Sequence, residues 1–147
     1  MTICIIPARK GSKRIKNKNI TIFNGKPIIY YAIDLAKKSK LFSRIIVSTD
    51  SLKIAKIARK YGAETPFVRA KKLSNHYTTS TEAVIDSIKK ISSESEKYHC
   101  CIYPTAILTQ KKDLVNGYKK IKITKADYLI PVTSYDYSPL RPLEKFG

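Results

Sequence analysis

The residues best suited to chemistry lie in one loop near the start of the chain, Arg9–Asn19, which reads R-K-G-S-K-R-I-K-N-K-N. Such a loop offers backbone N–H groups and several cations within a short stretch, and both attract the oxygens of a polyphosphate. Its spacing matches neither the GxxxxGKS/T nor the GxGxxG pattern of nucleotide-binding loops. The loop therefore predicts a phosphate site of another kind. The alternative interpretation is a solvated basic loop between a strand and a helix.

Regular elements must position this loop, and the sequence predicts them in alternation. The apolar run Ile3–Ile6 predicts a buried strand that ends at Pro7. Further strands are expected over Arg44–Ser48, Tyr98–Tyr103 and Tyr128–Val132, with a short extended piece at Phe67 and Val68. Helices are expected over Ile28–Lys38 with Pro27 at the first position, from an Asp50 or Ser51 cap through Lys60, and over Ser80–Ile91 and Asp113–Ile123.

This alternation predicts an α/β fold class: a three-layer α/β/α, Rossmann-like nucleotide-binding domain with a mostly parallel sheet covered on both faces. The length of 147 residues predicts a single domain over 1–147. Ligands of such sheets bind at the carboxyl ends of the strands. The basic loop, Thr49-Asp50 and Pro104-Thr105 all follow strands and are expected at that edge.

Composition narrows the classes of function. The formal net charge of +18 suits an anionic small substrate, an anionic surface or nucleic acid. The lysines are spread along the expected helices, which favours solvated faces, so a basic nucleic-acid-binding module stays a secondary alternative. No apolar run approaches the roughly 20 residues of a membrane span, and no secretory leader is visible. The three cysteines stand in apolar contexts and predict buried free thiols in a cytoplasmic protein, without a metal site.

The basic loop resembles the nucleotide-binding signature of the acylneuraminate cytidylyltransferase (CMP-sialic acid synthetase) family, P-A-R-x-G-S-K-R-I/L-P-x-K-N. The matching residues are Pro7, Ala8, Arg9, Gly11, Ser12, Lys13, Arg14, Ile15, Lys18 and Asn19. The resemblance implies a nucleotide-diphospho-sugar transferase type of fold. It also implies that Arg9, Lys13 and Lys18 act in catalysis at the CTP phosphates, with Ala8, Gly11, Ser12 and Asn19 in the binding loop. Lys10 is expected to face solvent.

A second stretch, Arg69–Ser80, is similar to the family pattern R-P-x-x-L-A/S-x-D followed by hydroxyl residues. Ala70 stands at the proline position and His76 at the aspartate position. The resemblance implies that Arg69, Thr78 and Ser80 help to select cytosine. The alternative for the hydroxyl residues is a plain helix N-cap, and capping is also the favoured interpretation of Asp50.

The strand that ends in C-I-Y-P-T-A resembles the pseudaminic acid branch of the family, whereas the sialic acid branch reads L-Q-P-T-S-P. The resemblance implies that Tyr103 and Arg141 face the sugar acid. The implied activity is cytidylyl transfer from CTP to a nonulosonic acid, giving the CMP-sugar and pyrophosphate. Pseudaminic, sialic, legionaminic and 3-deoxy-manno-octulosonic acids all remain open as substrates.

The resemblance also implies Mg²⁺ and a homodimer. The family's metal-binding aspartate pair and dimer-forming extension have no counterpart in this sequence, so no metal ligand is assigned. We therefore expect the 147-residue chain to be an interrupted family domain, inactive or nearly so, and monomeric or poorly soluble. The alternative is a remnant that binds CTP without turnover.

Overall fold

The computed structural model describes residues 2–12, 15–91 and 96–134. It divides into two compact units, residues 1–115 and 116–147, and each is described by itself. The helix α4, Lys111–Thr124, crosses the boundary between them. In the described part of the chain, no helix is both long and apolar enough to cross a membrane.

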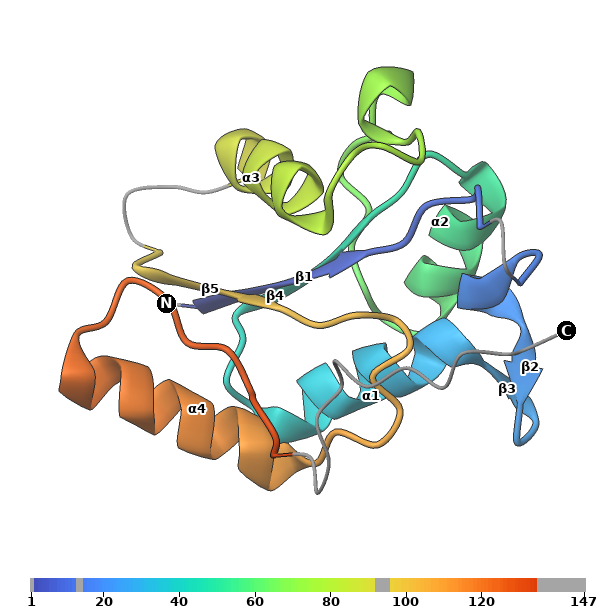
Figure 1. Ribbon diagram of the computed structural model, residues 1–147. Helices are drawn as coiled ribbons and strands as arrows, with labels where there is room; N and C mark the ends of the chain where they lie inside the picture. Colours follow the sequence, from blue (N-terminus) through green and yellow to red (C-terminus); the bar gives the residue numbers. More distant parts are fainter. Residues whose placement is uncertain (1, 13–14, 92–95, 135–147) are drawn as a thin grey trace, which may run out of the picture. The chain divides into compact units, whose positions relative to one another are not determined.

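The first unit is built on a three-stranded parallel sheet with the order β4-β1-β5 (Figure 1). The central strand β1, Thr2–Pro7, pairs with β4, Arg44–Ser48, from Ile3 opposite Arg44 to Pro7 opposite Ser48. On its other side β1 pairs with β5, Tyr98–Cys101. Single parallel bridges, Ile46 to Glu64 and Thr49 to Val68, continue the sheet beyond β4. All three strands therefore end at one edge.

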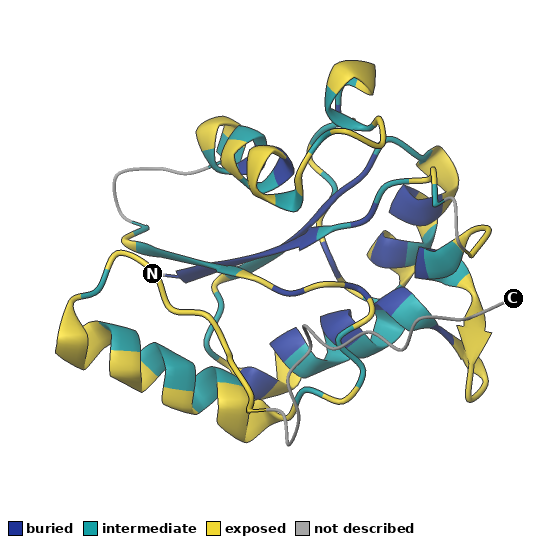
Figure 2. Ribbon diagram, in the orientation of Figure 1, coloured by how far each residue is buried: buried dark blue, intermediate teal, exposed yellow. Residues whose placement is uncertain are grey.

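Helices cover both faces of this sheet. On one face, Ile3, Ile5 and Ile46 pack against apolar side chains of α3, Ser80–Ile91. The opposite face packs against α1, Ile28–Ser39, and α2, Leu52–Lys60, through residues that include Cys4 and Val47. Figure 2 shows β1 buried along its length between these layers. Because each fully buried Ile contributes roughly 1.5–3 kcal/mol, this central strand is a rigid base for the loop that follows it.

Most of the predicted elements are confirmed. The structure has β4 and α3 with the predicted bounds, and β5 ends two residues before Tyr103. Pro27 is the N-cap of α1 and not its first helical residue. A small antiparallel hairpin was not expected: β2, Ile22–Phe23, and β3, Lys26–Pro27, are joined by Asn24 and Gly25, both with positive φ. An Asn-Gly pair suits this turn because both residues tolerate the left-handed conformation.

Two further predictions, for residues 128–132 and for the cysteines, are wrong. Residues 128–132 form no strand in the described part of the second unit, and Tyr128, Ile130 and Val132 are exposed. An apolar run becomes a strand only where it finds a hydrogen-bonding neighbour, and local pattern does not supply one.

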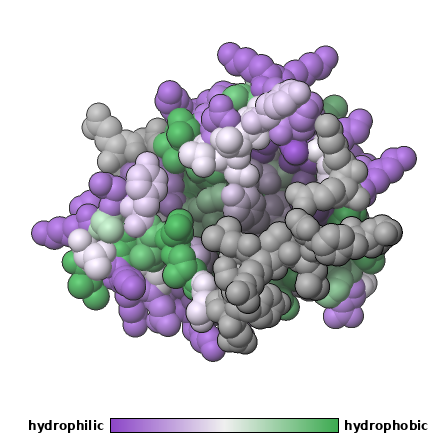
Figure 3. Space-filling view, in the orientation of Figure 1, coloured by the Kyte–Doolittle hydropathy of each residue, from purple (hydrophilic) through white to green (hydrophobic). Residues whose placement is uncertain are grey.

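Cys101 is exposed and not buried, while Cys4 is buried and Cys100 half-buried; all three thiols are free. Many hydrophilic side chains project from the face shown in Figure 3.

Candidate functional site

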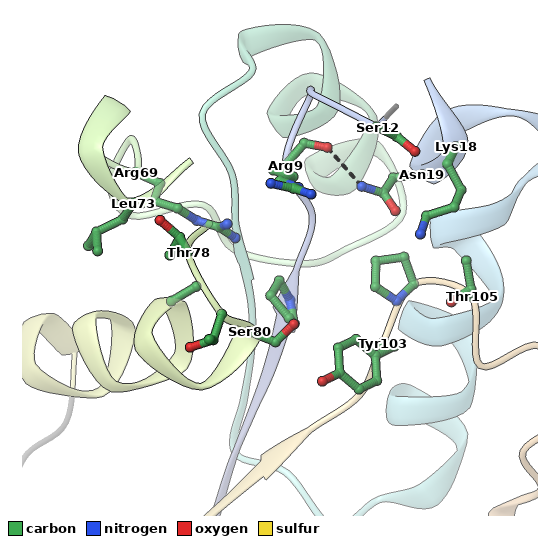
Figure 4. A pocket seen from close by; sticks show the side chains of 14 residues that line it. Arg9, Ser12, Lys18, Asn19, Arg69, Leu73, Thr78, Ser80, Tyr103 and Thr105 are labelled. Carbon is green, nitrogen blue, oxygen red and sulfur yellow. Dashed lines mark hydrogen bonds between the residues drawn. The ribbon is translucent and has the colours of Figure 1, made fainter. Parts of the chain in front are cut away.

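A cavity of about 180 Å³ lies at the carboxyl ends of the strands of the first unit (Figure 4). Its lining comes from the basic loop (Arg9–Asn19), from the stretch Arg69–Ser80 with the start of α3, and from the residues after β5. We call the second stretch the hydroxyl loop. The lining residues are Pro7, Arg9, Ser12, Lys18, Asn19, Arg69, Leu73, Thr78, Thr79, Ser80, Ala83, Tyr103, Pro104 and Thr105.

The basic loop is fastened to the sheet and to its own far end. The Ala8 N–H donates to the Ser48 carbonyl at 2.9 Å, and the Lys10 N–H donates to Asp50 Oδ1 at 2.8 Å. Asn19 is 7% exposed within the short 3₁₀ turn Lys18–Ile20, and its Nδ2 donates to the Arg9 carbonyl at 2.9 Å. The backbone on both sides of Arg9 is therefore held before any ligand arrives.

The structure brings four of the predicted basic-loop residues to the cavity wall: Arg9, Ser12, Lys18 and Asn19. In Figure 4 the Lys18 amine and the Arg9 guanidinium lie on opposite sides of the Asn19 side chain. Two other predicted binding residues are not in the lining. Ala8 is buried behind the loop, and Gly11 is exposed with open space around it. Lys13, predicted to act in catalysis, lies outside the described residues.

Arg69 gives the cavity a third cation, next to Arg9. It is 4% exposed, its Nε donates to Ser48 Oγ at 3.1 Å, and its Nη2 donates to the Ser48 carbonyl. Burial lowers the pKa of Arg69 from its ordinary value, the charge of Arg9 lowers it further, and Asp50 opposes both effects. Figure 4 shows the guanidinium groups of Arg9 and Arg69 close together. Two neighbouring cations, one from each loop, favour an anionic ligand.

The hydroxyl residues at the end of the hydroxyl loop have different hydrogen-bonding roles. Thr79 and Glu82 form a reciprocal capping box at the start of α3: the Thr79 N–H donates to Glu82 Oε2 at 2.7 Å, and the Glu82 N–H donates to Thr79 Oγ1 at 3.2 Å. The helix cap therefore belongs to Thr79. Thr78 donates from Oγ1 to the Lys72 carbonyl at 3.1 Å, and Ser80 stands in the first turn of α3. Both line the cavity.

The third wall follows β5. The Ile102 N–H donates to the Ile5 carbonyl at 3.1 Å, which continues the pairing with β1 and leads the chain to the cavity. Tyr103 is 52% exposed there, with Pro104 and Thr105 beside it. Arg141, the other residue predicted to face a sugar acid, lies outside the described residues.

Sequence reasoning missed several members of the site. Leu73, Thr79 and Ala83 also line the cavity. Asp50 does not cap α2, because Ser51 does so by accepting the Ile54 N–H at 3.4 Å. The place of Asp50 shortly after β4, at the same edge as the basic loop, was predicted, but its hydrogen bond to the Lys10 N–H was not.

Metal ligands are not gathered in the described residues. Within 2–12, 15–91 and 96–134, no three His, Cys, Asp or Glu side chains come together so as to hold a metal ion.

Comparison with known proteins gives consistent matches. The family described as Cytidylyltransferase matches residues 3–138. Two pseudaminic acid cytidylyltransferases from Campylobacter jejuni subsp. jejuni are 44% and 43% identical over 137 residues, covering 92% of this chain and 59% of each relative. An N-acylneuraminate cytidylyltransferase from Escherichia coli O18:K1:H7 is 30% identical, covering 99% of this chain and 35% of the relative. The chain thus spans well under two thirds of the length of these relatives.

Solved structures agree on the fold. A CMP:2-keto-3-deoxy-manno-octonic acid synthetase complexed with CTP is similar with a TM-score of 0.73 at 18% identity, covering 85% of this chain and 48% of that one. A cytidylyltransferase from Leptospira borgpetersenii is similar with a TM-score of 0.66 at 20% identity, covering 84% and 50%. The predicted α/β nucleotide-diphospho-sugar transferase type of fold is confirmed.

Proposed function

This chain belongs to the cytidylyltransferase family, and we propose that it activates a nonulosonic acid with CTP, giving the CMP-sugar and pyrophosphate. Pseudaminic acid is the proposed sugar, because the two relatives at 44% and 43% identity bear that name. We also propose that residues 1–147 belong to one nucleotide-binding domain, which the family match over residues 3–138 supports.

One observation carries the proposal: a single cavity collects cations and short hydroxyl side chains from the ends of all three parallel strands. Arg9 and Lys18 follow β1, Arg69 is fastened to the end of β4, and Tyr103 follows β5. A triphosphate needs the cations, and a cytosine edge can be read by short hydroxyls and backbone groups. The same cavity supplies both.

The reaction we propose is an in-line transfer. The anomeric hydroxyl oxygen of the sugar acid attacks the α-phosphorus of CTP, a new P–O bond forms, and the bond to the bridging oxygen of pyrophosphate breaks. The hydroxyl proton passes to water, and pyrophosphate carries away the bonding electrons. Arg9 and Lys18, together with Lys13, would hold the phosphates and stabilise the charge that develops on the leaving group. Ser12 and Asn19, with the backbone at Ala8 and Gly11, would complete the phosphate-binding loop.

The remaining assignments concern base and sugar. Arg69, Thr78 and Ser80 would surround the cytosine, while Tyr103 and Arg141 would face the sugar acid. Mg²⁺ is the metal we propose for the reaction from the family resemblance. Among the described residues no three His, Cys, Asp or Glu side chains come together, and the roles above are those of the chain's own side chains.

The test is CTP-dependent release of pyrophosphate with pseudaminic acid, run against N-acetylneuraminic acid and against no sugar, with the CMP-sugar identified by mass. Calorimetry with CTP, UTP and a single-stranded RNA measures binding separately. CTP binding that RNA does not displace is the expected result. Because we expect the 147-residue chain to be inactive or nearly so, sugar-dependent pyrophosphate release would show that these residues suffice for turnover. CTP binding without turnover would leave a nucleotide-binding protein only. Salt-dependent RNA binding that CTP does not displace would favour the nucleic-acid alternative.

A further inference from the structure

Asp50 holds the basic loop although it does not line the cavity. It stands two residues after the end of β4, and its Oδ1 accepts at 2.8 Å the N–H of Lys10, which lies 40 positions away in the sequence. The helix that begins after it does not need its carboxylate, because Ser51 caps α2 and the Ser51 N–H donates to Thr49 Oγ1 at 3.1 Å. The carboxylate is thus committed to the loop.

This contact is one of three that hold the backbone between Pro7 and Lys10. The Ala8 N–H is held by Ser48, the Arg9 carbonyl by Asn19, and the Lys10 N–H by Asp50. Two of these partners stand at the end of β4, which is buried and paired along its length with β1. Together they fix the backbone from which the Arg9 side chain reaches the cavity.

The charge of Asp50 acts in the opposite direction to this positioning. A carboxylate so close to the cations of the basic loop repels a triphosphate, so charge alone predicts that removing Asp50 tightens CTP binding. Loss of the hydrogen bond predicts the reverse, because a loop that must be ordered on binding costs affinity. The two effects have different signs and can be separated.

We propose that Asp50 is a positioning residue that presets the basic loop for the triphosphate by accepting the Lys10 N–H. The inference rests on the proposed function, since it assigns Asp50 to the same nucleotide site. It names a residue that acts through Arg9 and the loop backbone and does not itself contact the ligand.

Three variants of the full chain test it: Asp50→Ala, Asp50→Asn and, as matched control, Ser51→Ala. Asn removes the charge but keeps an oxygen that accepts an N–H. The measurements are hydrogen exchange of the Lys10 amide, and calorimetric affinities for CTP, CMP and inorganic tripolyphosphate. The last probe tests the loop without a base, and CMP tests the base with only one phosphate.

We expect Asp50→Ala to lose protection at the Lys10 amide and to bind CTP and tripolyphosphate about tenfold more weakly, as for a lost charge-assisted hydrogen bond. CMP affinity should stay near that of the wild type. Asp50→Asn should keep the protection and bind CTP at least as tightly as the wild type. Ser51→Ala should lower the melting temperature through α2 and leave both CTP affinity and Lys10 protection unchanged.

Other outcomes overturn the inference. Tighter CTP binding in both Asp50 variants would show that Asp50 acts on the triphosphate only by charge repulsion. Equal loss for CTP and CMP, or a Ser51→Ala variant that behaves like Asp50→Ala, would make its role purely structural. Unchanged hydrogen exchange of the Lys10 amide in Asp50→Ala would show that Asp50 does not hold this N–H, whatever the change in CTP affinity. A wild-type chain that binds neither CTP nor tripolyphosphate would instead overturn the proposed function, and this inference with it.

Discussion

The basic loop and the hydroxyl loop face one another across the same cavity, but they are held in different ways. The basic loop is fastened to distant parts of the chain, at Ser48 and Asp50. The hydroxyl loop is fastened to the sheet at its first residue: the Arg69 N–H donates to the Thr49 carbonyl at 2.9 Å, and its side chain reaches Ser48. Beyond that point its own side chains shape it.

Asn75 organises this self-contained part. Its Oδ1 accepts the N–H groups of Tyr77 and Thr78, each at 2.9 Å, and its Nδ2 donates to the Lys72 carbonyl at 2.8 Å. The Asn75 carbonyl accepts from the Arg9 guanidinium, which joins the two loops. The basic loop is therefore preorganised by the sheet. The hydroxyl loop, which is proposed to read the base, depends instead on a local network of hydrogen bonds that can open while the sheet stays intact.

Arg69 should give the largest effect, because it both lines the cavity and ties the hydroxyl loop to β4. Arg69→Ala leaves the Ser48 acceptors without their buried partner, and we expect a loss of about 1–3 kcal/mol in the free energy of unfolding, together with weaker CTP binding. Arg69→Lys keeps the charge but not the forked geometry. Urea unfolding and calorimetry measure the two quantities. Full stability in Arg69→Ala would show that the hydroxyl loop needs no tie to the sheet.

Arg9 should affect binding more than folding. Its backbone is fixed by neighbours, so Arg9→Ala removes the guanidinium and its hydrogen bond to the Asn75 carbonyl, and we expect CTP binding to weaken by about 2 kcal/mol or more. Lys10→Ala is the control, because the Lys10 side chain is exposed and only its backbone N–H is used. Calorimetry with CTP separates the two variants. Equal losses of CTP affinity in the two variants would indicate a diffuse basic patch and not a specific phosphate-binding loop.

Asn75 tests the wall proposed to read the base. The wild type should prefer CTP to UTP, and Asn75→Ala should reduce that preference by about 1 kcal/mol, because Thr78 loses its backbone anchor. Tripolyphosphate binding should change less than CTP binding. His76→Ala is the control, since His76 is exposed beside it and stacks on Tyr77. A loss of tripolyphosphate binding as large as the loss of CTP binding would mean that the two walls act as one.

Sequence reasoning succeeded where signals were local. Helical spacing and flanking turn residues set the bounds of α3, and an apolar run between polar residues set those of β4. It failed for residues 128–132 and for the hairpin at residues 22–27, because a strand exists only through its neighbour. The sequence shows an apolar run, but it does not show which other strand, if any, pairs with it.

The same contrast holds in the site. Arg9, Lys18 and Arg69 were predicted to bind one nucleotide, because two family motifs contain them, and the structure brings all three to one cavity. Asp50 was expected only at the same edge of the sheet, and Asn75 was not singled out, since their roles consist of hydrogen bonds to backbone groups. An acceptor side chain in a loop is compatible with a cap, a turn or a distant N–H. Only the fold decides which of these it meets.

Substitution of Glu82 should give the smallest effect. The pH dependence of its capping box distinguishes the start of α3, next to the hydroxyl loop, from the basic loop. Hydrogen bonds from the Thr79 N–H and hydroxyl lower the pKa of Glu82 below its ordinary value of 4.5. Because the folded-state pKa is the lower one, the stability from this capping box is fully present above pH 4.5 and is lost as the pH falls through the folded pKa.

Hydrogen exchange of the Glu82 amide, followed as the pH falls below 4.5, should therefore show the start of α3 loosening in the wild type. Glu82→Ala should be less protected already at neutral pH and should lack this transition, whereas Glu82→Gln should keep the box without titrating. The Ala8 amide, bonded to the Ser48 carbonyl, is the reference for the basic loop and should stay protected through the same range. If protection at Ala8 falls together with that at Glu82, the sheet does not hold the basic loop independently, and the contrast between the two walls is lost.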